Sequence, residues 1–182
     1  MGRFAEEASK AMVSRTRVSQ EMIAAAKKKL QVDQVTFGMD NYKTSDAMQD
    51  LALLYIANGQ FAEAKPLCER AYEIDLVSLG PDHHNLTLSL KTLGLFYGAQ
   101  GHPDLAEPFF EKALEIMINT VGPNHYLTAS TRSALSSVYR AQGKHEMANM
   151  MEPTRSAGCG CLSGIIVLFM LMVIIVAGFI FQ

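Results

Sequence analysis

The feature that most constrains the fold of this chain is a sequence repeat with a period of 42 residues. A leucine, a tyrosine, a glycine and an alanine each recur at that step through three copies. These columns are Leu51/Leu93/Leu135, Tyr55/Tyr97/Tyr139, Gly59/Gly101/Gly143 and Ala64/Ala106/Ala148. Repeats with a period of roughly 20 to 50 residues are typical of solenoids, in which each unit stacks on its neighbours.

Each copy contains two segments with helical periodicity. In the first segment, apolar residues recur at helical spacings, as Leu51, Leu54 and Tyr55 do. Gly59 follows this segment, as glycine often follows the carboxyl terminus of a helix. The second segment begins near Phe61, and no strand-like alternation appears. The sequence therefore predicts an all-α solenoid of antiparallel helix pairs, with a concave face lined by the first helices.

The joints between copies are also repeated. The letters LGPDHHNL at 79–86 reappear as VGPNHYLT at 121–128, and as a worn copy, FGMDNY, at 37–42. We interpret Gly80 as the stop of one helix and Asp82 as the cap of the next, accepting from its free N–H groups.

The repeat register divides the chain into four parts. We expect residues 1–42 to form a degenerate first repeat and residues 43–152 to form about 2.5 clear copies. Residues 153–161 are polar and contain proline and glycine, which predicts a linker. Residues 162–181 complete the chain except for Gln182.

The segment at 162–181, LSGIIVLFMLMVIIVAGFIF, has no charged residue. As a helix of twenty residues it would be about 30 Å long, which matches the hydrocarbon core of a bilayer. The alternative, a buried core helix, needs partners on every side, and the amphipathic remainder of the chain already supplies its own. We predict a transmembrane helix that acts as a tail anchor, with residues 1 to about 155 in the cytosol.

Three cysteines receive different interpretations. Cys159 and Cys161 adjoin the expected span and are candidates for S-palmitoylation, with passive placement as the alternative. Cys68 lies in an amphipathic helical pattern, which favours a core position. Because no basic residue follows the span, we favour the endoplasmic reticulum or later secretory membranes over the mitochondrial outer membrane.

The run LALLYIANGQFAEAKPLCERAYEIDLVSLGPDHH, at 51–84, resembles a tetratricopeptide repeat. It is most similar to the 42-residue variety of kinesin light chains and nephrocystin-3-like proteins, and the resemblance covers about residues 44–150. It implies a peptide-binding groove, in which paired asparagines on the first helices hold the ligand. The matching pairs in this chain are Gln49-Asp50, Lys91-Thr92 and Ser133-Ala134.

By that correspondence, the candidate binding residues on the concave face are Gln49, Asp50, Lys91, Thr92 and Ser133. The resemblance also implies that His83 and His125 cap and pack the turn between repeats. The adjacent His83 and His84 raise the alternative of a metal site. Structural zinc normally needs four ligands, usually with cysteine among them, so we expect no metal.

No catalytic pattern emerges. The glycines of GLFYGAQG lie in a helix and its turn rather than between a strand and a helix, so they predict no phosphate loop. A net charge of −2 argues against nucleic-acid binding. The basic run at Lys27–Lys29, with Arg15 and Arg17, is either a solvated face or a patch for anionic lipid.

We therefore predict a protein without enzymatic activity or cofactor. The favoured function is a membrane-anchored adaptor or scaffold that recruits a protein or peptide partner to a cytosolic membrane surface. The alternative is a homo-oligomeric structural protein that self-associates to shape or tether membranes.

Overall fold

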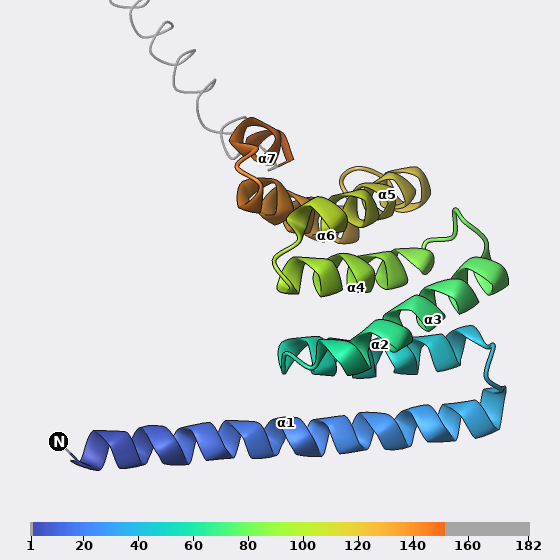
Figure 1. The fold of residues 1–182 in the computed structure, drawn as a ribbon. Coiled ribbons are helices and arrows are strands. Elements are labelled where there is room, and N and C mark those ends of the chain that lie inside the picture. Colours follow the sequence, from blue (N-terminus) through green and yellow to red (C-terminus); the bar gives the residue numbers. More distant parts are fainter. Residues whose placement is uncertain (1, 152–182) are drawn as a thin grey trace, which may run out of the picture.

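The structure is a computed structural model that describes residues 2–151, with side chains from Gln20 onward. Within these residues the chain forms α-helices and no strand. In order, they are α1 (Gly2–Phe37), α2 (Tyr42–Ala57), α3 (Phe61–Leu79), α4 (Leu86–Ala99), α5 (Pro103–Val121), α6 (Tyr126–Ala141) and α7 (His145–Met151). Figure 1 shows them stacked in chain order, which confirms the predicted all-α solenoid.

The predicted linker at 153–161 and the predicted span at 162–181 lie outside the described residues. The helices from α1 to α7 include none that is long and apolar enough to cross a membrane.

Glycines with a left-handed backbone set the helix lengths. In the described chain, six glycines have φ between 72° and 94°, and they stand 21 residues apart: Gly38, Gly59, Gly80, Gly101, Gly122 and Gly143. A side chain at such φ is strained, so glycine is the residue that ends a helix there. Two helices fit into each 42-residue period because each one is ended by such a glycine.

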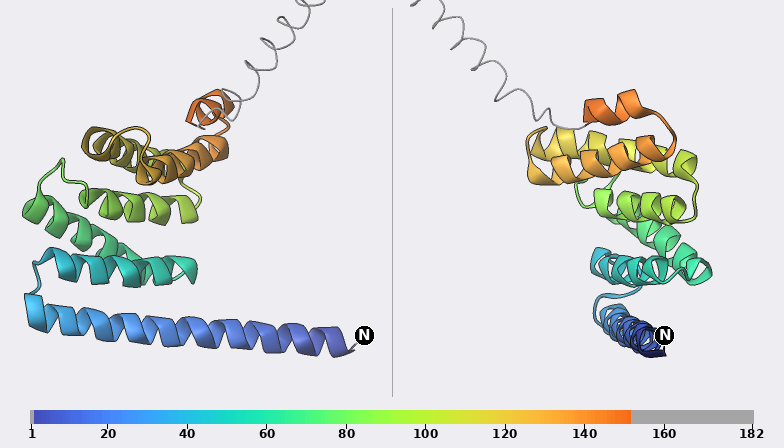
Figure 2. Two further views of the ribbon diagram at one scale, coloured as in Figure 1. Left: turned by 180° about the vertical axis from the view of Figure 1, so that it is seen from behind. Right: turned by 90° about the vertical axis from the view of Figure 1, so that its left-hand side faces the viewer.

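The first helix corrects the prediction that every copy is a helix pair. The glycine series would place a turn at position 17, but Arg17 stands there and α1 runs through for 36 residues. Its amino-terminal half extends beyond the rest of the stack (Figures 1 and 2). Its other half ends at Phe37, one period before Leu79, and packs Ile23 and Leu30 into the core shared with α2 and α3. This half takes the place of a second helix.

Small residues bring the helices of each pair close together. Ala64, Ala106 and Ala148, one per copy, have no exposed surface. Cys68 is buried, which confirms its predicted core position, and this burial raises the pKa of its thiol to about 12. A thiol with that pKa stays protonated at neutral pH and behaves as a small apolar side chain.

The histidines at two joints accept hydrogen bonds from the backbone, as the resemblance implied. Nδ1 of His83 accepts from the N–H of Asn85 at 3.2 Å, and Nδ1 of His125 accepts from the N–H of Leu127 at 3.2 Å. Since these N–H groups lie at the start of α4 and near the start of α6, the side chains satisfy donors that the helices leave free. His84 stacks on His83, with ring centroids 4.5 Å apart.

Asp82 does not cap α4, so that prediction is wrong. The N-cap position is Asn85, three residues further along the chain. The side chain of Asp82 is 84% exposed, and its Oδ1 lies 3.7 Å from Nζ of Lys112 on α5. The carboxylate therefore links the joint to the following second helix.

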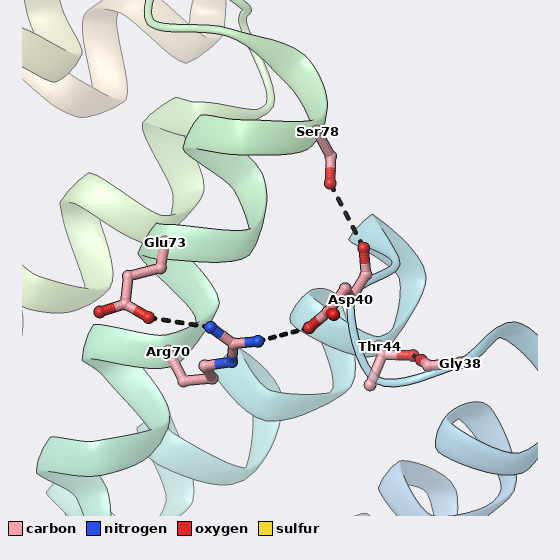
Figure 3. A network of polar contacts seen from close by, with 6 residues as sticks. All are labelled: Gly38, Asp40, Thr44, Arg70, Glu73 and Ser78. Atoms are coloured by element: carbon pink, nitrogen blue, oxygen red, sulfur yellow. Dashed lines mark hydrogen bonds and ion pairs between the residues drawn. The ribbon is translucent and has the colours of Figure 1, made fainter.

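The same link occurs one period earlier, as Figure 3 shows. Asp40 pairs with Arg70, whose Nη1 also donates to Oε2 of Glu73 at 3.0 Å. Lys112 has an equivalent second bond, 3.0 Å long, to Glu115. These pairs are exposed to solvent, and exposed ion pairs contribute little to stability. The pairs recur at equivalent positions one period apart, and they stabilise the fold only weakly.

At two facing core positions, the sizes of the side chains differ between successive copies. Ala52 and Cys68 in one copy correspond to Gly94 and Phe110 in the next, and all four are buried. A Cβ at Gly94 would lie 2.5 Å from Cε2 of Phe110. The aromatic ring therefore fits only because the facing helix has no side chain there.

Gly94→Ala should destabilise the fold, because the new methyl group overlaps the Phe110 ring. Gly98→Ala, one turn later, is the matched control, since its Cβ would meet only Cβ of Ala106, at 4.0 Å. Both changes gain helix propensity, so we compare them directly. We expect Gly94→Ala to have a free energy of unfolding about 1–3 kcal/mol below that of Gly98→Ala, measured by urea unfolding. Equal stabilities would contradict the close packing.

Candidate functional site

The first helices α2, α4 and α6 present a common face. Asp46, Asp50, Leu53 and Ala57 follow one another at spacings of three and four along α2, so their side chains lie on one side of the helix. Two hollows open on this face. One lies over the amino-terminal halves of the three helices and the other over their carboxyl-terminal halves.

The first hollow, which we call the polar groove, has a volume of about 500 Å³. It is lined by Lys29, Asp46, Asp50, His84, Asn85, Thr87, Leu88, Lys91, Met117, Leu127 and Thr131. Carboxylates thus come from α2 and ammonium groups from α1 and α4.

Two charged groups of the polar groove differ in their pairing. Lys29 of α1 donates to Oδ2 of Asp50 at 2.6 Å, which raises the pKa of the lysine. Lys91 is half-buried, and this burial lowers its pKa. Burial raises the pKa of Asp46, and the carboxylates of Asp75 and Asp50 add to that shift. The groove is therefore a partly desolvated surface on which a charged ligand group meets both signs of charge.

A buried polar cluster joins α2, α3 and α4. Nε2 of Gln49 donates to Oδ2 of Asp75 at 2.9 Å, and its distances to Oγ of Ser45 and of Ser89 are both 3.0 Å. Ser89 also donates to the same carboxylate of Asp75. Oδ1 of Asp75 and Oε1 of Gln49 have no hydrogen-bond partner within the described part of the chain. Burial raises the pKa of Asp75, while the hydrogen bonds oppose that shift.

Burial corrects two of the predicted binding residues. Gln49 and Thr92 are each 1% exposed, so their predicted place on the concave surface is wrong. Gln49 turns toward α3 and α4, and Oγ1 of Thr92 donates to the carbonyl of Leu88 within its own helix at 2.9 Å.

The other three predicted residues do not form one cluster. Asp50 and Lys91 line the polar groove, whereas Ser133 is exposed and does not line it. A binding role for these three stays a prediction. Asp46 was not foreseen, although it stands one helical turn before Asp50 on the same helix face.

The second hollow, the apolar groove, has a volume of about 770 Å³ and was not foreseen. It is lined by Leu53, Ile56, Ala57, Gly94, Leu95, Gly98, Ala99, Gly101, Pro103, Phe110, Ala134, Ser137, Val138 and Ala141. Leu95, which lines it from α4, is 45% exposed. The signal in the sequence was the column Ala57/Ala99/Ala141, which keeps one small residue per first helix.

Two lysines of the basic run on α1 contact side chains of α2. Nζ of Lys27 lies 5.7 Å from the ring centroid of Tyr55, and Lys29 pairs with Asp50. The side chains of Arg15 and Arg17 lie outside the described part, so a lipid-binding patch stays a prediction. Among the described residues, no three His, Cys, Asp or Glu side chains are placed to hold a metal ion.

The stacked helix pairs and the grooves on their first helices define a repeat scaffold. The family model for the tetratricopeptide repeat matches residues 44–119 and 86–152. The chain belongs to the tetratricopeptide repeat family, whose repeats generally bind protein partners.

Solved structures share this fold. BtubC (BKLC) from P. vanneervenii aligns with a TM-score of 0.64 at 21% identity, over 72% of this chain and 54% of that one. A Podosopora anserina protein described as a kinesin light chain with nearly identical TPR-like repeats aligns with a TM-score of 0.66. Its identity is 22%, over 83% of this chain and 74% of that one. The chain thus spans about half the length of BtubC. No curated protein matches it by sequence.

Asp75 should make stability depend on pH. Because its folded pKa is raised above the ordinary value of 3.8, the folded state binds the proton more tightly than the unfolded state. Stability is then lost as the pH rises from about 4 through the folded pKa, by at most about 1.4 kcal/mol per pH unit for one proton.

Asp75→Asn keeps an acceptor oxygen but removes the titration. We expect the variant to gain stability relative to the parent as the pH rises from 4 to 7, measured by urea unfolding at each pH. A difference that is constant or shrinks over this range would contradict the assignment.

Proposed function

We propose that this chain is a non-enzymatic scaffold that holds a protein partner against its first helices at a cytosolic membrane surface. The observation that carries the proposal is the apolar groove. It is lined by residues of α2, α4 and α6, and Leu95 on α4 is about half exposed to water. Exposed apolar patches of this kind mark interaction sites in soluble domains.

The two grooves together suggest the chemistry of the partner. A segment that lies along the first helices meets leucines and small residues at one end, and Asp46, Asp50 and Lys91 at the other. An amphipathic helix or an extended peptide with an apolar end and a charged end fits this order. Tetratricopeptide repeat proteins are typically scaffolds rather than enzymes, which agrees with such a role.

The membrane part of the proposal rests on residues 162–181, which are uncharged and long enough to span a bilayer as a helix. Cys159 and Cys161 stand just before this segment, where acylation would add a second membrane contact.

A flotation experiment with three variants tests the proposal. Full-length chain on phosphatidylcholine vesicles is incubated with cytosol, and the proteins that float with it are quantified by mass spectrometry. Leu95→Asp places a charge in the apolar groove and should lower partner recovery at least about tenfold, since the loss exceeds roughly 1.4 kcal/mol. Val77→Asp is the control, because Val77 is 86% exposed on α3 and lines neither groove.

The third variant lacks residues 162–181. It should still bind the partner in solution but should not float with the vesicles. Equal partner recovery by the Leu95→Asp and Val77→Asp chains would contradict binding in the groove. Recovery of the chain alone, as a self-associated oligomer, would favour the structural role instead.

A further inference from the structure

We propose that residues 162–181 of this chain occupy the apolar groove whenever the chain is away from a membrane. The groove then has two exclusive occupants, its own carboxyl-terminal segment in water and a partner protein at the membrane. This inference goes beyond recruitment, because it makes the groove available only after the segment has left it.

The groove has the surface that such a segment requires. Leu53, Ile56 and Leu95 offer large apolar contacts, while Ala57, Gly98 and Ala99 let a second helix approach the backbone closely. No charged residue lines it. The segment in turn carries no charge over twenty residues. In water, each of the two surfaces is an apolar patch that lowers its free energy when it is covered.

The dimensions also agree. The groove takes residues from α2, α4 and α6 and has a volume of about 770 Å³. A helix of twenty residues would be about 30 Å long and about 10–12 Å across with its side chains. One stretch of the segment would therefore lie in the groove, over α2, α4 and α6.

The chain can reach the groove from where the described structure ends. Met151 of α7 packs against a cluster that contains Leu135, Val138 and Tyr139, and Val138 also lines the apolar groove. The ten residues at 152–161 span up to about 33–36 Å when extended. An intramolecular contact of this kind has a high effective concentration because the connection is short.

The two other hollows fit the segment less well. The polar groove holds the Lys29–Asp50 pair and the charged groups of Asp46 and Lys91, and an apolar helix would desolvate these charges without offering them a partner. The hollow between α1 and α2 is lined partly by Lys27 and Glu63. Charge therefore selects the apolar groove for an uncharged segment.

Photocrosslinking within the full-length chain tests this proposal. Benzoylphenylalanine replaces Leu95, or Ala141 in a second chain, and Val77 in the control chain. Each chain is synthesised in a membrane-free extract and irradiated. Arg155 is the last lysine or arginine in the sequence, so trypsin releases the segment within one peptide, residues 156–182.

We expect the probes at Leu95 and Ala141 to crosslink to peptide 156–182 at least tenfold more than the probe at Val77. Adding phosphatidylcholine vesicles before irradiation should lower that yield at least fivefold, because the segment then has a bilayer to enter. Circular dichroism of each chain confirms that the helices are retained.

Three results would overturn the proposal. One is an equal yield from the groove probes and the Val77 probe in folded chains, and another is a yield that vesicles leave unchanged. The third comes from mixing heavy-isotope and ordinary chains, where crosslinks between the two would show that a second copy fills the groove. None of these results bears on whether a cytosolic partner binds at the membrane, so failure here is distinguishable from failure of the proposed function.

Discussion

The left-handed glycine turn, repeated every 21 residues from Gly38 to Gly143, is the constraint on which the rest of the structure depends. Each turn reverses the chain with no side chain in the way, so α2, α4 and α6 all end one period apart. Because their ends are in register, equivalent positions on the first helices lie side by side. The buried alanines at 64, 106 and 148 then let each second helix pack closely behind.

Equal geometry with unequal side chains produces the two grooves. The column that holds Asp75 in one copy holds Met117 in the next, and the column of Gln49 continues with Lys91. The repeat thus fixes where the helices lie, and substitutions within a column decide which side chains are buried and which line a groove. The amino-terminal halves of the first helices line the polar, partly desolvated groove, and the carboxyl-terminal halves line the open apolar groove.

Much of this arrangement could be predicted, because a period of 42 residues, with glycines that recur at the expected helix ends, is a strong signal. The helix pairs followed from it. The core position of Cys68 followed from the amphipathic pattern, and the backbone contacts of His83 and His125 agree with what the family resemblance implied. The continuous α1 could have been foreseen too, since Arg17 stands where the glycine series requires a turn.

The site was harder to predict, for a physical reason. Adjacent residues on a helix point about 100° apart, so the two residues of a matched pair have different surroundings. The groove-lining member is the second of the pair in Gln49-Asp50 and the first in Lys91-Thr92. Alignment alone therefore could not choose between them. Which side of a first helix is covered depends on how its neighbours pack, and the apolar groove is likewise made of residues from three copies.

The most direct measurement compares L-alanine with D-alanine at Gly101, introduced by chemical ligation. Its φ is 80°, and an L-Cβ there would meet nothing within 4 Å, so the effect isolates backbone conformation from crowding. We expect L-alanine to lower the free energy of unfolding by about 1–2 kcal/mol. We expect D-alanine, which prefers this conformation, to preserve or raise it. Equal losses with both enantiomers would contradict the dependence of the solenoid on its left-handed glycines.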